Sequence, residues 1–523
     1  MSFPDVRHVA VIGAGISGVC SAAHLLEQNI HVTVLERSSI AGGVWHFDEH
    51  AAPDSSYPNE VPSVGDFEKA STELFETGYL TPPRTPDTSA GETDKDWRMS
   101  ARTTFAPPGA CYEKLNNNVP LTLMKNSLAD WPEGVPEFVN QRILEEYVQR
   151  IAHEHGVHER TQYGVRVENV RKLGKSWEVR TTYRQQDNSA SFRLLPRTQL
   201  FDAVVVATGH YHNPRIPDFP GLAEWKQRYP DRISHSKQYR RAAPFKSETI
   251  LLVGAGTSST DIAKELSGVA KHVFQTSRGG PFDHPASVLP ANTTRVGNVQ
   301  AFELTGTHEL HSDEALPGSI LLHNGQRLCG INRIILCTGY VTSYPFLPQY
   351  HDDHRSADDA DEHVLVTKDG DMVHNLHKDI FYIEEPTLAF IGKPYHTANF
   401  SLFDFQAQLM ARVFAKLTSF PSKSELRAEY NERVRLKGRG RDFHSLRQTG
   451  AEPAYVNSLV EWANRDIVKE SSTVSMRGHT QEWLSKYAEF RETIEKRIGL
   501  RLAEAKAVAN KFDHVVITGP NAC

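Results

Sequence analysis

The chain has 523 residues, more than one compact domain usually holds, so we expect at least two domains. Hydrophobic residues make up 39% and charged residues 23%, close to globular averages, which excludes a largely disordered or fibrous chain. The net charge of −6, from 58 basic and 64 acidic residues, gives no basic surplus that would favour a nucleic-acid partner.

The sequence shows no signal for membranes, disulfides or metals. No run approaches the ~20 consecutive apolar residues of a transmembrane helix, and the first residues lack the features of a signal peptide. The chain contains five widely spaced cysteines: Cys20, Cys111, Cys329, Cys337 and Cys523. Because no CxxC pair occurs, we expect neither a disulfide framework nor a metal site. A cytoplasmic protein without a transmembrane segment is the resulting prediction.

Residues 9–36 carry a complete dinucleotide-binding pattern. An apolar strand leads into three glycines, an Ala- and Leu-rich helix follows, and a second strand ends at Glu36. Gly13 permits a tight turn, Gly15 lets the backbone approach a pyrophosphate, and Gly18 lets helix and strand pack closely. The Glu36 carboxylate can accept hydrogen bonds from ribose hydroxyls and repels a 2′-phosphate. The site therefore favours FAD or NAD over NADP.

Further loops close to the cofactors are expected at glycine positions outside this pattern. Gly43, Val44 and Trp45 follow the ribose strand in AGGVW, where a glycine pair lets a loop pass close to a flavin. An ordinary turn would have the same sequence. Two apolar strands end in Thr-Gly, which adds Gly209 and Gly339 to the candidate cofactor residues.

A second glycine motif begins at Thr249, in ETILLVGAGTSSTDIAKEL. Its candidate cofactor residues are Gly254, Gly256, Ser258, Ser277 and Arg278. The third glycine position holds Ser259, and the next strand ends in Ser277 and Arg278 instead of an acid. An arginine beside a hydroxyl can bind a 2′-phosphate, which favours NADPH, although Arg278 could also lie on a solvated strand end. FAD in the first site and NADPH in the second predict hydride transfer from nicotinamide to flavin.

Alternating strand and helix patterns predict an α/β fold with two doubly wound, Rossmann-like domains and C-terminal helices. We expect a discontinuous FAD-binding domain at 1–212 and 330–523, with an NADPH-binding domain inserted at 213–329. The first part contains a long insertion, 48–110, rich in Pro, Ser and Thr. From Phe405 the apolar spacing predicts packing helices.

The motifs resemble those of the flavin-containing monooxygenase family over about 7–417. They are GAGISG, LERSSIAGGVW, YEKLNNNVP, ATGHYHNPRIPDFPG, RISHSKQYR, ILCTGY, LAFIG and FDFQAQ. Trp225 and Gln227 replace the Phe and Gly of the family fingerprint, and Tyr239, not Trp, ends it, which leans away from Baeyer–Villiger enzymes. Disulfide reductases of similar layout need a cysteine pair after the first ribose strand, and no cysteine lies between Cys20 and Cys111.

The resemblance implies an N,N-dimethylaniline monooxygenase-like enzyme. In it, a C4a-hydroperoxide of FAD, formed with dioxygen, oxygenates the amine nitrogen or sulfide sulfur of a small organic substrate. Asn118 is placed on the asparagine that the family keeps beside the flavin, as the catalytic residue; the alternative is a loop-capping asparagine. His235 lines the NADP path or orients Arg240; the alternative is a buried structural histidine. Gln406 contacts the flavin edge or lies on a helix surface.

Three other functions stay open: a Baeyer–Villiger ketone oxygenase, an NADPH oxidase, and a flavin-binding protein with a regulatory or structural role. The second glycine motif argues against the last, since a simple FAD-binding module would not need it. The sequence leaves the substrate's identity and a homo-oligomeric assembly open.

Overall fold

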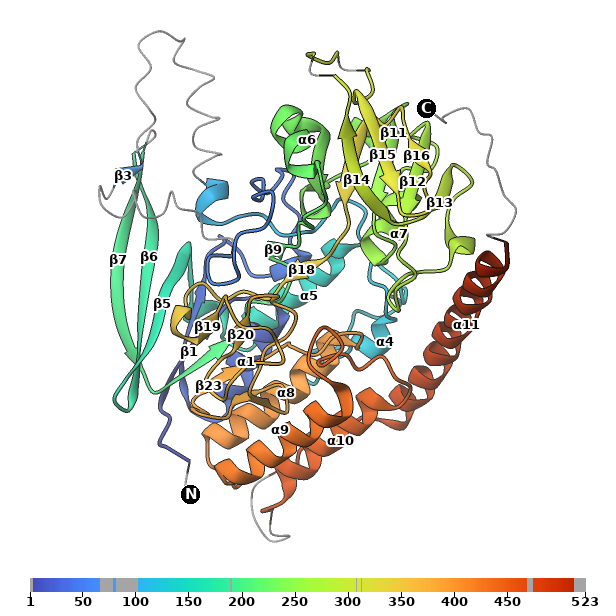
Figure 1. Ribbon diagram of the computed structural model, residues 1–523. Helices are drawn as coiled ribbons and strands as arrows, with labels where there is room; N and C mark the ends of the chain where they lie inside the picture. Colours follow the sequence, from blue (N-terminus) through green and yellow to red (C-terminus); the bar gives the residue numbers. More distant parts are fainter. Residues whose placement is uncertain are drawn as a thin grey trace.

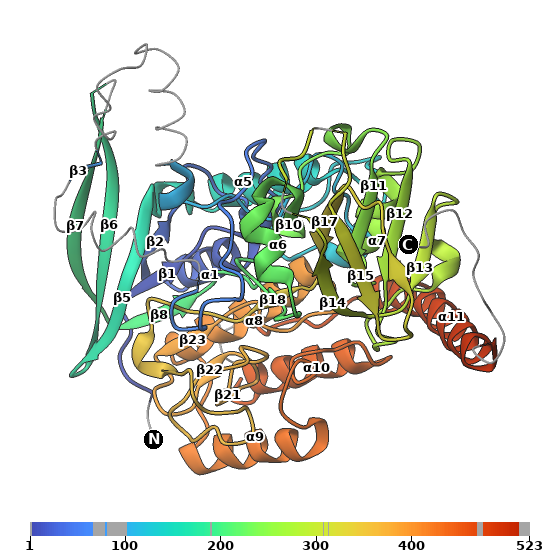
Figure 2. The same cartoon turned by 45° about the horizontal axis from the view of Figure 1, so that its top comes forward.

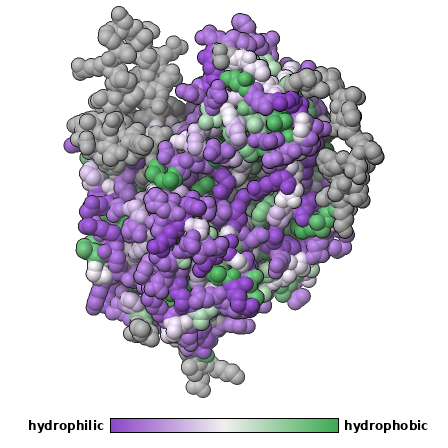
Figure 3. All heavy atoms as spheres, in the orientation of Figure 1, coloured by the Kyte–Doolittle hydropathy of each residue, from purple (hydrophilic) through white to green (hydrophobic). Residues whose placement is uncertain are grey.

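The computed structural model describes residues 3–65, 79–80, 102–188, 191–306, 308–311, 313–467 and 474–511. Two sheets, one wholly and one mostly parallel, lie side by side with their helices, and further helices from the end of the chain pack beneath and beside them (Figures 1 and 2). The face shown in Figure 3 is largely hydrophilic, with apolar residues in small separate groups. Within the described ranges, no helix is long and apolar enough to cross a membrane.

The first sheet has seven strands in the order β21–β22–β23–β8–β1–β2–β4. Their bounds are β1 His8–Ile12, β2 His31–Glu36, β4 Thr161–Tyr163, β8 Ala203–Val206, β21 Leu376–His377, β22 Phe381–Tyr382 and β23 Leu388–Phe390. The strands from β23 to β4 are parallel. Helix α1 (Ile16–Glu27) connects β1 to β2, and α5 (Gln141–Glu154) precedes β4. The predicted strand–helix–strand unit is therefore confirmed.

Strand β1 is apolar along its whole length because both faces of the sheet are covered. Val9 and Val11 face a core shared with α1, α5 and α8 (Asn399–Phe414). Ala10 and Ile12 face the opposite core, which contains Trp177 of a four-stranded antiparallel layer. That layer consists of β3 Tyr79–Leu80, β5 Val165–Leu173, β6 Ser176–Asn188 and β7 Ser191–Phe201. The first domain is thus built of three layers.

The second sheet has five parallel strands in the order β10–β17–β11–β12–β13. Their bounds are β10 Ile233–His235, β11 Thr249–Val253, β12 His272–Thr276, β13 Thr293–Val296 and β17 Arg333–Leu336. Helix α7 (Thr257–Glu265) connects β11 to β12. Helix α6 (Leu222–Arg228) packs on an antiparallel sheet of β14 Val299–Leu304, β15 Gly318–Leu322 and β16 Arg327–Leu328.

Strand β17 corrects the boundary expected at residue 329. It pairs with both β10 and β11, so the inserted domain extends past that residue. The two connections between the domains, β9 (Asn213–Pro214) and β18 (Tyr340–Val341), pair antiparallel with each other. The chain therefore enters the second domain near 213 and leaves it near 340, at a point beside its entry (Figure 1).

The insertion 48–110 is described only in part, since residues 66–78 and 81–101 lie outside the described ranges. Its two ends are held together by Arg240 of the second domain. The guanidinium donates hydrogen bonds to the carbonyl of His50 (2.9 Å), near the start of the insertion, and to that of Gly109 (3.0 Å), near its end. The base of the insertion is therefore fixed against the second domain.

The last part of the chain is helical, as predicted. It contains α8, α9 (Lys423–Lys437), α10 (Ala451–Asn464) and α11 (Gln481–Lys511). Helix α11 begins against α4 (Leu121–Met124), where Trp483 Nε1 donates to the Leu123 carbonyl at 2.9 Å. Its other end reaches the second domain (Figure 1), where Glu504 accepts from the Ala286 N–H at 2.6 Å.

The remaining elements are β19 His351–Asp352, β20 Val366–Thr367 and 3-10 turns η1 Gly43–Trp45, η2 His158–Arg160, η3 Pro230–Arg232, η4 Ser236–Gln238, η5 Ala243–Phe245, η6 Ala286–Val288 and η7 Pro348–Tyr350.

Candidate functional sites

The first glycine turn has the backbone that a dinucleotide site requires. Gly13 has φ +103°, and a Cβ at this position would lie 2.7 Å from the Ala207 carbonyl oxygen. A Cβ on Gly18 would lie 1.9 Å from the Gly13 carbonyl oxygen, so no side chain fits there. Gly15 is the N-cap of α1 and provides no side-chain hydrogen bond. The first N–H groups of α1 therefore remain available for a diphosphate.

The AGGVW loop lies directly against this turn. Gly43 has φ +60°, and a Cβ on it would lie 2.8 Å from the Cα of Gly15. Val44 and Trp45 continue the loop as η1, and the Trp45 ring lies 6.0 Å from the Phe400 ring at the start of α8. The structure thus brings the glycine pair to the α1 turn, and the two backbones form a cradle that side chains would fill.

Glu36 ends β2 beside the same turn. Its Oε2 accepts from the Ala14 N–H at 2.7 Å, and its Oε1 accepts from the Ser38 N–H at 2.8 Å. Each carboxylate oxygen can accept a second hydrogen bond, so capacity for ribose hydroxyls remains. The glycine cradle, the uncapped helix and this acid fit FAD.

The second glycine turn repeats the design. Gly254 has φ +115°, and a Cβ on it would lie 2.6 Å from the Cys337 carbonyl oxygen. Gly256 is the N-cap of α7, again without a side-chain cap, and Ser258 is exposed in the first turn of the helix. Ser259 is fully buried and accepts from Gln275 Nε2 at 2.7 Å, so a serine packs where the usual pattern has glycine.

At the end of β12, the strand after α7, one of the two predicted phosphate ligands, Ser277, is already engaged. The Ser277 hydroxyl donates to Asp283 Oδ2 at 2.6 Å and accepts from the Gly279 N–H at 3.0 Å. It therefore organises the turn and is not a spare donor for a phosphate, because its one proton is committed to Asp283. Arg278 is exposed, and within the described residues its guanidinium makes no hydrogen bond or ion pair. The arginine alone is available for a 2′-phosphate.

In the NNN segment, Asn117 is buried and holds the loop together, whereas the side chain of Asn118 is exposed. Asn117 is 5% exposed; its Nδ2 donates to the carbonyls of Val119 (2.7 Å) and Glu137 (2.8 Å), and its Oδ1 accepts from the Val139 N–H (2.6 Å). Asn118 is exposed. The loop-capping role considered for Asn118 therefore belongs to Asn117, and the placement of Asn118 beside a flavin stays a prediction.

His235 is 1% exposed, and its predicted place on the NADP path stays a prediction. Its Nδ1 accepts from the Lys237 N–H at 3.1 Å and caps η4. Burial lowers the pKa of His235 to about 3, so the ring is neutral. Nor does the ring orient Arg240, whose hydrogen bonds go to backbone carbonyls, among them those of His50, Cys111 and Gly109. The alternative of a buried structural histidine is the one that the structure supports.

Gln406 is fully buried, so the helix-surface alternative is wrong. Its Oε1 accepts from the Gly392 N–H at 3.0 Å, and its Nε2 donates to the Tyr455 hydroxyl at 2.7 Å. A Cβ on Gly392 would lie 3.3 Å from the Cβ of Ser17 in the first turn of α1. Gln406 thus holds the loop after β23 against the first dinucleotide turn, and direct contact with a flavin stays a prediction.

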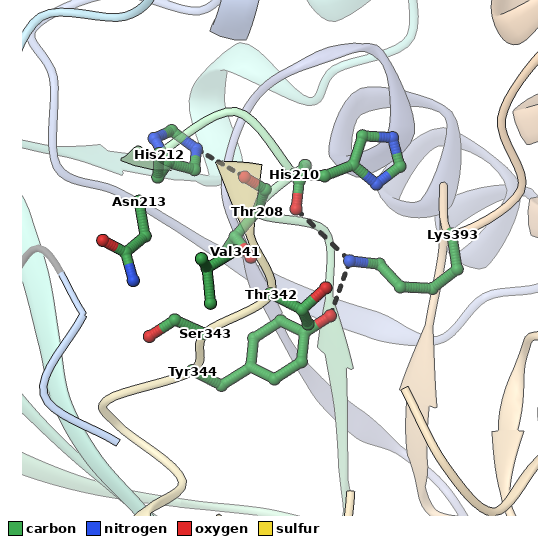
Figure 4. A pocket seen from close by; sticks show the side chains of 10 residues that line it. Thr208, His210, His212, Asn213, Val341, Thr342, Ser343, Tyr344 and Lys393 are labelled. Carbon is green, nitrogen blue, oxygen red and sulfur yellow. Dashed lines mark hydrogen bonds between the residues drawn. The ribbon is translucent and has the colours of Figure 1, made fainter. Parts of the chain in front are cut away.

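A small polar pocket contains a lysine that the sequence reasoning missed (Figure 4). Lys393 is 4% exposed, and its Nζ donates to the Tyr344 hydroxyl (2.5 Å) and the Gly209 carbonyl (3.3 Å). Burial lowers the pKa of Lys393 to about 7. Gly209 precedes β9 and Tyr344 follows β18, so Lys393 ties both connections between the domains to the end of β23. The only sequence signal was a lysine directly after the apolar run LAFIG.

Comparison with known proteins identifies the family. The model of the flavin-binding monooxygenase-like family matches residues 97–284 and 307–471, and a FAD-dependent oxidoreductase model matches 8–95. Flavin-containing monooxygenase ustF2 of Aspergillus flavus is 39% identical over 92% of this chain and 97% of its own length. Flavin-containing monooxygenase ustF1 of the same organism is 34% identical over 92% and 89%, respectively.

Solved structures show the same fold. The S-allyl-L-cysteine S-oxygenase from Allium sativum superposes with a TM-score of 0.64 at 22% identity, covering 97% of this chain and 99% of the other. A cyclohexanone monooxygenase superposes with a TM-score of 0.52 at 11% identity, covering 88% and 98%. These matches show that the chain is a FAD-dependent protein, and NADPH is the usual reductant of such enzymes. The chain belongs to the flavin-binding monooxygenase-like family.

Proposed function

We propose that the protein is an NADPH-dependent flavin monooxygenase that oxygenates an amine nitrogen or a sulfide sulfur of a small organic substrate. One oxygen atom of dioxygen enters the product, and the other leaves as water with the two electrons of NADPH. The observation that carries the proposal is the pair of uncapped helices, α1 and α7, each preceded by a glycine turn. Glu36 beside the first and Arg278 beside the second suit cofactors without and with a 2′-phosphate.

The residues of the chain would bind and orient the cofactors. FAD, when bound, supplies the redox chemistry with NADPH and dioxygen. The N–H groups at the start of α1 would hold its diphosphate, Glu36 its ribose, and Gly43 would let the backbone pass close to it. Asn118, whose side chain is exposed, would offer an amide donor and acceptor to the bound flavin.

No strong protein acid or base is required for an amine or sulfide substrate, because such a nucleophile brings its own electron pair. This agrees with the chemistry of the described site residues, which are glycines, amides and groups that bind phosphate or ribose. A ketone substrate on the same scaffold would follow the Baeyer–Villiger course and give an ester. Tyr239 at the end of the fingerprint supports the nitrogen or sulfur substrate.

A substrate panel tests this choice. We would incubate the FAD-loaded enzyme in air with NADPH and, separately, a tertiary aryl amine, a thioether and a cyclic ketone. The expected products are an N-oxide or S-oxide, formed with consumption of one NADPH each. An ester from the ketone without any N- or S-oxide would assign the enzyme to the Baeyer–Villiger class. NADPH consumption that yields only hydrogen peroxide with every substrate would assign an oxidase.

A further inference from the structure

Arg441 reaches the second dinucleotide turn from the other domain. It lies between α9 and α10, in the part of the chain that follows the inserted domain. Its Nη2 lies 3.2 Å from the position that a Cβ on Gly339 would occupy, and its Cζ lies 5.6 Å from the centroid of the Phe282 ring. Arg441 therefore touches two segments of the inserted domain at once.

Those two segments flank the turn before α7. Gly339 follows β17, the strand beside β11, and a Cβ on Gly254 at the end of β11 would meet the Cys337 carbonyl oxygen at 2.6 Å. On the other side, the Phe282 carbonyl oxygen lies 3.9 Å from the Cβ position of Gly256. Arg441 thus contacts two segments that border the uncapped start of α7, where a diphosphate would bind.

In the described part of the chain, the charge of Arg441 faces the Phe282 ring and forms no ion pair. The side chain is partly buried, and across the described ranges its guanidinium makes no hydrogen bond or ion pair. Arg447 faces the same Phe282 ring at 5.2 Å but is paired with Asp442 at 3.1 Å, so the nearby carboxylate is engaged. A guanidinium is always charged, so the N–H groups of Arg441 can donate hydrogen bonds to an anionic group that binds there.

We propose that Arg441 binds the diphosphate of NADPH and so closes the first domain onto the reductant held by the second. The inference rests on the proposed use of NADPH at the α7 turn. A guanidinium can donate two parallel hydrogen bonds to a phosphate, and the N–H groups of α7 would meet the same diphosphate from the opposite side. Since NADPH and NADH share the diphosphate, Arg441 contributes equally to both, whereas Arg278 contributes only where the 2′-phosphate is present.

The test compares dissociation constants of NADP⁺ and NAD⁺ for the oxidised, FAD-loaded protein, followed by calorimetry and by the change in flavin absorbance. Arg441→Gln should weaken the binding of both by a similar factor, about ten- to a hundredfold for a lost charged hydrogen bond. Arg447→Gln is the matched control: it removes the other cation from the Phe282 ring and should change both constants less than about twofold. Arg278→Gln should weaken the binding of NADP⁺ and leave the binding of NAD⁺ unchanged.

Each contrary result has a distinct meaning. Unchanged constants in Arg441→Gln, equal losses in Arg441→Gln and Arg447→Gln, or a loss confined to NADP⁺ would each overturn the inference and leave the proposed function standing. A wild-type protein without affinity for NADP⁺ would instead refute the proposed function. If Arg441→Gln does not retain FAD, Arg441→Lys takes its place. This variant keeps the positive charge but lacks the two parallel N–H donors of a guanidinium, so it should weaken the binding of NADP⁺ and of NAD⁺ severalfold. Unchanged binding would again overturn the inference.

Discussion

Adjacent residues of one type have opposite surroundings in the NNN segment. Asn117 makes three hydrogen bonds to backbone groups in a buried position, whereas the side chain of Asn118 is exposed. The resemblance predicts an asparagine near the flavin, but the sequence could not say which amide braces the loop, because the partners Glu137 and Val139 lie about twenty residues further along the chain. The two residues can therefore be tested as a pair.

Asn118→Ala should leave folding and flavin reduction by NADPH unchanged and increase the hydrogen peroxide released per NADPH consumed. Asn117→Ala should lower the free energy of unfolding by about 2–3 kcal/mol, since it leaves buried backbone groups unpaired. The measurements are peroxide yield and chemical denaturation of the same preparations. Unchanged coupling in Asn118→Ala would remove this residue from the site.

Arg278 is the residue on which the choice of NADPH over NADH depends. Arg278→Ala should raise the KM for NADPH about ten- to a hundredfold, the value of one lost charged hydrogen bond, with little effect on the KM for NADH. Steady-state kinetics with both reductants measure the effect. An equal rise for both would show that Arg278 does not bind the 2′-phosphate.

The sequence could identify residues that are required because the backbone leaves no room for a side chain. Gly13, Gly18 and Gly254 each occupy a place where a Cβ would collide with a carbonyl oxygen, and that requirement is visible as a motif. Gln406 shows the opposite case. Its amide forms hydrogen bonds with Gly392 and Tyr455, which lie 14 and 49 residues away, so no local sequence pattern predicts its burial.

At the scale of elements, the strand–helix–strand units were predictable because their signals are local. The contacts between such elements were not. Helices α1 and α8 come from opposite ends of the first domain and are joined by His24 of α1 and Asp404 of α8, with Nε2 and Oδ1 2.6 Å apart. Glu27 lies 2.8 Å from the other ring nitrogen. Burial opposes protonation of His24, but the two carboxylates outweigh it and raise the pKa to about 9.

This ion pair predicts a pH dependence of stability. Because the folded pKa of His24 lies above the ordinary histidine pKa of 6.5, the stabilisation is fully present below pH 6.5 and is lost as the pH rises toward 9. The free energy of unfolding should fall by about 2–3 kcal/mol over this window. His24→Gln should abolish this part of the dependence, whereas His323→Gln, at an exposed position, should retain it. Denaturation curves at several pH values measure this dependence. A free energy of unfolding that falls with pH in His24→Gln as steeply as in the wild type would contradict the assignment.

At the scale of the whole molecule, the order of domains was predictable and one boundary was not. The sequence indicated that a second dinucleotide domain interrupts the first. It placed the exit at 329 because the following apolar strand, RIILCTGY, was assigned to the first domain. In the fold this strand is β17, paired between β10 and β11, and such long-range pairing has no local signature. Arg441 and Lys393 were missed for the same reason, since each acts across the domain boundary.

The central claim is that electrons from NADPH pass through FAD to activate dioxygen for transfer to a nucleophile. The most direct measurement reduces the FAD-loaded protein with one equivalent of NADPH without oxygen, then admits isotopically labelled dioxygen together with a thioether or tertiary amine. The account predicts rapid bleaching of the flavin by NADPH and one labelled oxygen atom in the S-oxide or N-oxide for each flavin. Absence of bleaching, or reoxidation of the flavin with all of the label in hydrogen peroxide, would contradict it.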